Sequence, residues 1–324
     1  MQLNLTLDIP PLPRPITYTD NILLIGSCFT EHMSDRLGQH KFNVLSNPNG
    51  ILFNPLSVSL SLNSYMDRKM YTEQDLFHLN ELWNSWDHHT RFSHIDREQA
   101  LHNINNSQLE AYYSIKQANW VMITLGSAYQ YYLQAVQRPV ANNHRAPAQW
   151  FDKKMLTTED IVTVLSGTLG RLFEFNPDVQ VMFTISPVRH IRDGVINNNR
   201  SKARLIEAVH TLCERFRNTY YFPAYELLID ILRDYRFYDI DFVHPNYLAT
   251  SYVWEQFVKS CIAPDTQKVM QEVQEIATAR AHRPRFPETE GHAKFKASYV
   301  QKVQDLLKRH PNLNLKEELD YFSN

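Results

Sequence analysis

The sequence predicts an α/β fold built on a parallel sheet. Along the 324 residues, short apolar runs alternate with longer segments in which apolar side chains recur at helical spacing. This alternation is typical of strands joined by crossover helices. Three of the runs are apolar at nearly every position, as expected for strands that are covered on both faces. The five expected strands are residues 22–25, 42–45, 120–125, 179–185 and 220–222.

The segments between these runs predict amphipathic helices. Residues 158–173 and 201–216 both carry apolar side chains at spacings of three and four, which places them on one helical face. Asp96 is followed three positions later by Gln99, a pair that can cap a helix running to about residue 118.

The chain divides into a core, residues 1–262, and a C-terminal extension, residues 263–324. Inside the core, residues 51–95 form a long insertion after the second expected strand. An active-site lid and a structural addition are both open for this insertion. The extension is charged and helix-prone, and its "HRPRFPE" segment breaks the pattern. We expect helices there that pack on the core or mediate contacts between copies of the chain.

Composition argues against several classes of partner. The formal net charge is −2, so nothing predicts electrostatic binding to nucleic acid or to anionic lipid. The N-terminus lacks the pattern of a signal peptide, and no apolar run approaches the roughly 20 residues of a membrane span. Three cysteines, an odd and sparse set, fit a reducing compartment. We therefore expect a cytoplasmic protein with no membrane or nucleic-acid partner.

One expected strand runs directly into a possible nucleophile. In "NILLIGSCFT", residues 21–30, the strand ends at Gly26-Ser27-Cys28 and a helix follows. Ligands of α/β proteins bind at this edge of the sheet, and free N–H groups at a helix N-terminus favour negative charge. Ser27 is thus either a nucleophile or an N-cap. Cys28 competes as a thiol, but an isolated cysteine more often packs as a small apolar side chain.

A partner for such a serine lies near the end of the core. Asp241 and His244 stand three positions apart in "FYDIDFVHPNYL", residues 237–248, just before Pro245. A nucleophilic serine needs a base, and the base needs a carboxylate that holds its tautomer. The alternative is a helix-entry turn with a capping aspartate.

Together the two motifs resemble the SGNH (GDSL-type) hydrolase superfamily and, within it, the GSCFA family. The family signature is present as Gly26-Ser27-Cys28-Phe29-Thr30, with Thr30 in place of the final alanine. The resemblance covers residues 21 to about 260. Other similar stretches are "NPNGILFNPLS" (47–57), "WNSWDHHTRFS" (83–93), "TLGSAY" (124–129), "SPVRH" (186–190), "NNRSKA" (198–203) and "LRDYRFYDIDFVHP" (232–245).

The resemblance implies a flavodoxin-like three-layer sandwich with a mostly parallel five-stranded sheet, followed by the helical C-terminal extension. It also implies a catalytic triad in which Ser27 is the nucleophile, His244 the general base and Asp241 the orienting carboxylate. Asp239 is a rival for the last role, but the superfamily spacing favours Asp241.

The resemblance further implies an oxyanion hole. Its first two donors are the N–H groups of Ser27 and Gly50. The third donor in the superfamily is an asparagine side chain in a Gly-x-Asn motif, but this chain has Gly126-Ser127-Ala128 at that place. Ser127 is the candidate replacement. Loss of one oxyanion donor typically costs about 10²–10³ in rate.

The stretch after the fourth expected strand predicts substrate contacts. Arg189 and His190 should face the same sheet edge as Ser27, where Arg189 could bind a carboxylate or phosphate and His190 could donate to an oxyanion or a sugar hydroxyl. The alternative is an Arg189–Asp193 ion pair and a solvated histidine. Ser201 and Lys202 either close this loop over the site or cap a helix.

The insertion carries an aromatic cluster. Trp86 and His89 are predicted to form a wall over Ser27 that binds substrate, and packing of the tryptophans is the alternative. We expect no metal, because the adjacent residues His88 and His89 point apart in a strand and cannot both ligate one ion. No glycine-rich phosphate loop follows any strand, so no nucleotide cofactor is expected.

These observations predict a serine hydrolase or acyltransferase of SGNH type that acts on acyl esters without a cofactor. O-acyl groups of carbohydrates are a candidate substrate class by analogy of fold. The alternative is a catalytically weak SGNH-like module that binds a glycan or a small acid through the aromatic insertion and Arg189.

Overall fold

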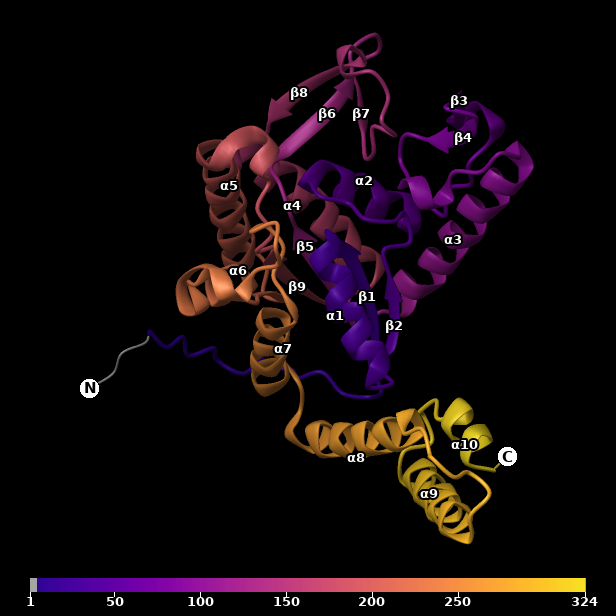
Figure 1. The fold of residues 1–324 in the computed structure, drawn as a ribbon. Coiled ribbons are helices and arrows are strands. Elements are labelled where there is room, and N and C mark those ends of the chain that lie inside the picture. The colour runs from indigo at the N-terminus through magenta and orange to yellow at the C-terminus, as the bar shows by residue number, and fades with distance from the viewer. Residues whose placement is uncertain (1–4, 324) are drawn as a thin grey trace.

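The computed structural model describes residues 5–323, and its centre is a five-stranded parallel sheet (Figure 1). The strand order is β10-β9-β5-β1-β2, and every neighbouring pair is parallel. This is the flavodoxin-like order of a doubly wound sheet. The predicted fold class is confirmed, and each strand lies within one residue of its expected bounds. The strands are β1 (Asn21–Gly26), β2 (Asn43–Ser46), β5 (Trp120–Leu125), β9 (Gln180–Ile185) and β10 (Thr219–Tyr221).

Helices cover both faces of the sheet and make the three-layer sandwich. Along β1, Leu23 and Ile25 face one apolar cluster, and Ile22 and Leu24 face another. The first cluster contains residues of α2 (Pro55–Met66), α3 (Arg97–Gln117), α4 (Thr158–Phe175) and α5 (Gly194–Arg215). The second contains residues of α1 (Cys28–Gln39), α6 (Ala224–Glu226) and α7 (Tyr247–Cys261).

Helix α2 belongs to the core, although its sequence lies in the insertion expected at residues 51–95. Pro55 opens the helix, and the Asn54 side chain caps it by accepting a hydrogen bond from the Ser57 N–H at 2.9 Å. Val58 and Leu62 are fully buried against the sheet. Residues 55–66 are therefore not a lid. The rest of the insertion contains an antiparallel hairpin, β3 (Leu76–Leu79) and β4 (Leu82–Ser85).

A second sheet follows β5 and was not expected from the sequence. It has three antiparallel strands in the order β7-β6-β8. Figure 1 shows it projecting from one end of the sandwich, on the same side as the β3–β4 hairpin. The strands are β6 (Tyr129–Leu133), β7 (Arg138–Val140) and β8 (Phe151–Met155).

One of two helices begins where its sequence predicts, and the other begins earlier. Helix α3 begins as predicted, since the Asp96 carboxylate accepts a hydrogen bond from the Gln99 N–H at 2.8 Å. Helix α5 begins at Gly194, well before the expected start at Ser201. As a result Ser201 and Lys202 lie inside a helix and are buried rather than placed on a loop.

The C-terminal extension is helical, as predicted. It consists of α8 (Pro264–Ala281), α9 (Glu290–Arg309) and α10 (Lys316–Ser323), which enclose an apolar cluster of their own. Figure 1 shows these helices grouped beyond the end of α7, away from the sheet. Contacts between copies of the chain through this extension stay a prediction. No helix within residues 5–323 combines the length and apolarity needed to cross a bilayer.

A buried carboxylate ties the extension to the core. Glu318 of α10 has a side chain only 3% exposed and pairs with Lys41, which precedes β2, at 2.8 Å and with Arg280 of α8 at 2.9 Å. Lys41 and Arg280 stay partly exposed when Glu318 is neutralised, and a hydrogen bond to a charged group contributes about 1.5–3 kcal/mol. We expect Glu318→Gln to lower the free energy of unfolding by about that amount, measured by urea titration.

The neighbouring glutamate provides a matched control. Glu317 also pairs with Arg280, but its side chain is 71% exposed. Glu317→Gln should leave the unfolding midpoint almost unchanged. Equal effects of the two substitutions would show that Glu318 does not hold the extension on the core.

Candidate functional site

Ser27 lies at the carboxyl edge of the sheet, between β1 and α1. Gly26 before it has φ +147°, and a Cβ there would lie 2.2 Å from the carbonyl oxygen of Thr124. Only glycine fits this close approach of two strands. Ser27 occupies the N-cap position of α1, but its side chain makes no capping hydrogen bond. The hydroxyl is buried and has no hydrogen-bond partner among residues 5–323.

Two other segments contact the Ser27 turn. A Cβ added to Gly126, which follows β5, would meet the Ser27 Cβ at 3.4 Å. The carbonyl of Phe53 accepts hydrogen bonds from the N–H groups of Gly126 and Ser127, both at 2.8 Å. The Leu52 N–H donates to the Gly26 carbonyl at 2.9 Å. The segments after β2 and β5 therefore meet at the serine.

The groups expected to form an oxyanion hole are already hydrogen-bonded within the protein. The Ser27 N–H donates to the Thr124 carbonyl at 3.1 Å, and the Gly50 N–H donates to the Asn47 carbonyl at 2.7 Å. The Ser127 hydroxyl accepts from the Tyr129 N–H at 3.1 Å. An oxyanion at Ser27 would have to replace these acceptors in order to bind the amides.

Asp241 and His244 form the expected pair. His244 Nδ1 lies 2.6 Å from Asp241 Oδ2, while Oδ1 accepts hydrogen bonds from the N–H groups of Val243 and His244. These hydrogen bonds, that of the His244 ring first, lower the pKa of Asp241 to about 2. An ionised carboxylate only accepts, so Nδ1 carries the proton and Nε2 is left as the basic nitrogen. The contact of Asp239 with His244 is made by its backbone N–H, which donates to the His244 carbonyl.

The structure does not join this pair to Ser27 by a hydrogen bond, since the serine hydroxyl has no partner among residues 5–323. The side chains of His244 and Asp241 are 50% and 49% exposed, whereas Ser27 is 2% exposed. The helices that follow them are neighbours, because Arg36 of α1 donates to the Ser251 hydroxyl of α7 at 2.7 Å. Figure 1 shows α1 and α7 side by side.

His190 reaches the Ser27 turn through Gly126. Its Nε2 lies 3.1 Å from the Gly126 carbonyl oxygen, which can only accept, so Nε2 carries a proton. Its ring meets Phe53 edge to face at 5.8 Å. Burial, followed by the nearby charge of Lys202, lowers the pKa of His190 to about 4. His190 is therefore a neutral donor on the same edge as the serine.

Arg189 connects the loop after β9 to the histidine loop. Its guanidinium carbon lies 5.4 Å from the centre of the Tyr238 ring, three residues before Asp241. The alternative Arg189–Asp193 pair is wrong, because Asp193 pairs with Lys153.

Trp86 and His89 differ in their surroundings. Trp86 is 9% exposed and stacks on Phe77 with ring centroids 3.6 Å apart, between the β3–β4 hairpin and the second sheet. These contacts are those of a packing residue. His89 lies against Gly50, where a Cβ would be 2.1 Å from the His89 Cβ. Only His89 is thus next to a segment that borders Ser27.

Cys28 is the first residue of α1 and is partly buried rather than part of the core. Burial raises the pKa of its thiol, which disfavours the reactive thiolate. Within residues 5–323, no cluster of three or more histidine, cysteine or acidic side chains is arranged to hold a metal ion.

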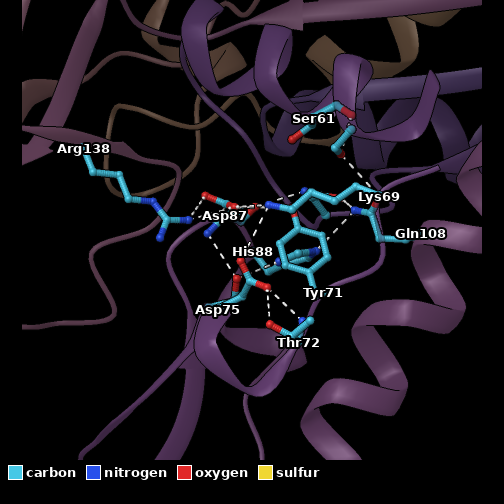
Figure 2. A network of polar contacts seen from close by, with 12 residues as sticks. Ser61, Lys69, Tyr71, Thr72, Asp75, Asp87, His88, Gln108 and Arg138 are labelled. Atoms are coloured by element: carbon cyan, nitrogen blue, oxygen red, sulfur yellow. Dashed lines mark hydrogen bonds and ion pairs between the residues drawn. The ribbon is translucent and has the colours of Figure 1, made fainter. Parts of the chain in front are cut away.

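A polar network next to the segment that carries Gly50 was not predicted from the sequence. Figure 2 shows Asp87 at its centre, facing Arg138, Lys69 and Tyr71. Both carboxylate oxygens of Asp87 accept from Arg138, at 2.9 and 3.0 Å, and Lys69 lies 3.6 Å away. The sequence signal for this network is the polar cluster in "WNSWDHHTRFS", which contains Asp87.

This network fixes the segment that carries Gly50. The Asn49 side chain donates to the Asp87 carbonyl at 3.0 Å and accepts from the Gln108 side chain at 2.8 Å. His88 is fully buried beside Gln108, and its Nδ1 lies 3.0 Å from the Ser85 hydroxyl. The loop after β2 is therefore supported by α3 and by the segment after β4.

Two family models match the chain. The GSCFA family model matches residues 21–257, and the model of the GSCFA domain protein, C-terminal domain, matches residues 273–324. No curated protein matches the sequence. Among solved structures, the chain is similar to an acetyl xylan esterase (Est2A) from the rumen bacterium Butyrivibrio proteoclasticus, with 10% identity and a TM-score of 0.38. That match covers 75% of this chain and 63% of the esterase, less than two thirds of its length.

Burial of His88 predicts acid sensitivity of the fold. Desolvation lowers the pKa of this histidine to about 3, whereas the unfolded chain binds the proton near pH 6.5. The unfolded state then holds more protons below pH 6.5, so stability falls as pH decreases through that range. We expect His88 to account for about 2 kcal/mol of lost unfolding free energy between pH 7 and pH 5.

The measurement is urea unfolding of wild type and His88→Gln at both pH values. Glutamine stays neutral, so the variant should be less stable at pH 7 but lose less stability on acidification. An identical loss in the two proteins would exclude His88 as the source.

Proposed function

The chain belongs to the GSCFA family, and we propose that it is an SGNH-type serine hydrolase or acyltransferase that acts on acyl esters. Ser27 attacks the ester carbonyl, His244 takes the hydroxyl proton on Nε2, and Asp241 stabilises the resulting imidazolium. The observation that carries this proposal is the buried Ser27 hydroxyl, which has no partner among residues 5–323 at the N-terminus of α1. A buried polar group without a partner calls for an explanation, and a reacting hydroxyl supplies one.

The proposal requires His244 to approach Ser27. Catalytic hydrogen bonds are often long or absent in a free enzyme and form in the substrate complex. Asp241 holds both the ring and the backbone N–H of His244, so the pair can move as one unit. The segment follows Arg233, a non-glycine residue at φ 34°, and the side chains of Asp241 and His244 are half-exposed, so a local shift of this pair disrupts little of their own packing.

The substrate class is an acyl ester, with O-acyl groups of carbohydrates as the first class to test. The tetrahedral intermediate breaks the ester C–O bond, and the leaving alcohol takes the proton from His244, which leaves an acyl group on Ser27. Attack of water on the acyl-enzyme then gives a hydrolase, and attack of a sugar hydroxyl gives an acyltransferase. His190 is close enough to the serine to contact either acceptor. Its Nε2–H donates to the carbonyl of Gly126, the residue that packs on Ser27. The triad mechanism needs no cofactor.

The second candidate is a catalytically weak module that binds a glycan or a small acid. The engaged N–H groups of Ser27 and Gly50 favour it, since neither amide is free to bind an oxyanion at the serine. Arg189 would supply the charge for an acidic ligand. Burial of Trp86 against Phe77 weighs against the aromatic wall that this candidate uses.

Labelling with a fluorophosphonate, detected by intact mass, tests the proposal. We expect wild type and Cys28→Ala to gain one adduct and Ser27→Ala to gain none. His244→Gln should slow labelling by at least about 100-fold, since a general base typically contributes 10²–10⁴. A wild type that stays unlabelled at high probe concentration would favour the binding module.

Asp239→Asn is the matched control for Asp241→Asn. Both carboxylates lie on the same exposed loop, but only Asp241 accepts from the His244 ring. Asp241→Asn should slow labelling strongly, because it removes the charge that stabilises the imidazolium, and Asp239→Asn should not. The reverse order would refute the assignment of Asp241.

A further inference from the structure

A lysine is buried below the Ser27 turn without an anionic partner. Lys202 of α5 is 1% exposed, and its Nζ donates to the carbonyl oxygens of Gly126 at 2.7 Å and Ser186 at 2.5 Å. These are the first residues after β5 and β9. None of the ion pairs found within residues 5–323 includes Lys202.

Such a placement is costly for a residue with only a structural role. An ammonium removed from water without a carboxylate loses hydration that two carbonyls replace only in part. Burial accordingly lowers the pKa of Lys202 to about 7. A glutamine could link two carbonyls without this cost. Buried ionisable groups with shifted pKa values are enriched at functional sites.

The lysine is coupled to the serine by contact and by charge. Gly126, whose carbonyl Lys202 holds, is also the residue that packs on Ser27 and accepts from His190. Burial raises the pKa of the Cys28 thiol, and the charge of Lys202 partly offsets that rise. The field of the ammonium thus reaches the residue directly after Ser27.

The other groups around the ammonium do not cancel its charge. They are the Cys28 thiol of α1, the His190 ring after β9 and the Tyr225 ring of α6, whose centre lies 6.0 Å from Nζ. The pKa of Tyr225 is raised, chiefly by burial, and that of His190 is lowered, so both rings are neutral near pH 7.

We infer that Lys202 is a positioning residue of the Ser27 site, which holds the Gly126 segment against the serine and supplies positive charge that stabilises an oxyanion there. The inference rests on the proposed function.

A change in pH distinguishes the effect of the Lys202 charge from the effect of its two hydrogen bonds. A neutral amine has two N–H groups, enough for both carbonyls, so deprotonation removes the charge and keeps both hydrogen bonds. If the charge stabilises the oxyanion, the rate of Ser27 labelling falls as Lys202 deprotonates above about pH 7. If Lys202 only holds the Gly126 segment in place, the rate of Ser27 labelling does not fall in this pH range.

The experiment compares full-length wild type, Lys202→Met and Ser201→Ala by fluorophosphonate labelling of Ser27 from pH 5 to pH 9. Ser201 is the matched control, because its hydroxyl accepts from the Ala128 N–H at 2.8 Å and so supports the same segment without charge. We expect Lys202→Met to label about 100-fold more slowly and to lose the decline at alkaline pH. Ser201→Ala should keep the wild-type profile.

A second measurement does not depend on catalysis. The rate of Cys28 carbamidomethylation by iodoacetamide at pH 6, where Lys202 is charged, reports the thiolate population and is followed by peptide mass spectrometry. It should be lower in Lys202→Met than in wild type and unchanged in Ser201→Ala. Equal Cys28 rates in wild type and Lys202→Met, or equal labelling profiles, would overturn the inference. A wild type without any Ser27 labelling would instead overturn the proposed function.

Lys202→Arg keeps the test decisive if the methionine variant does not fold. Arginine retains the charge and the donors and does not titrate in this range. Its labelling rate should stay high up to pH 9. A decline that matches wild type would mean that another group causes it and that the charge of Lys202 has no role.

Discussion

The structure depends on the close approach of β1 and β5 at Gly26. A side chain there would collide with the Thr124 carbonyl, so the two strands can end side by side only with glycine at this position. Both polar backbone groups of Gly26 are used as well. Its N–H donates to the Asn47 side chain at 2.8 Å, and its carbonyl accepts from Leu52. One glycine thereby joins β5, the segment after β2 and the start of α1, and everything proposed for Ser27 follows from that junction.

Much of the core was predictable because burial leaves a simple pattern in parallel strands. Helix α2 was not, since its serines alternate with apolar residues and hide the helical period in "PLSVSLSLNSYM". In the structure these serines are buried but satisfied: the Ser59 hydroxyl lies 2.6 Å from that of Thr168 on α4. Small side chains let the two helices approach closely. The second sheet was missed because strands such as "FDKKM" carry charge and lack a continuous apolar face.

The candidate site was predictable where its geometry is local. The three-residue spacing made Asp241 a candidate partner of the His244 ring, and the superfamily resemblance favoured it over Asp239. The edge of the sheet placed His190 near Ser27. The position of Lys202 could not be predicted from neighbouring residues in the sequence. Its burial depends on the early start of α5, where the asparagine-rich segment 197–199 has low helix propensity. A tertiary contact overrides that propensity, since the Asn198 side chain accepts from the His190 N–H at 2.9 Å.

The Ser27 and Gly50 N–H groups already donate to protein carbonyls, and this does not by itself distinguish an enzyme from a binding module. The free energies of the hydrogen bonds show why. A neutral backbone hydrogen bond such as that from Gly50 to Asn47 contributes about 0.5–1.5 kcal/mol net. A donor to an oxyanion typically contributes about 2.7–4 kcal/mol to the transition state. Exchange of the Asn47 carbonyl for an oxyanion is therefore favourable once charge develops on the substrate. In the proposed mechanism, bonds to protein carbonyls keep these donors ordered until then, and the positive charge at Lys202 stabilises the oxyanion that replaces those carbonyls.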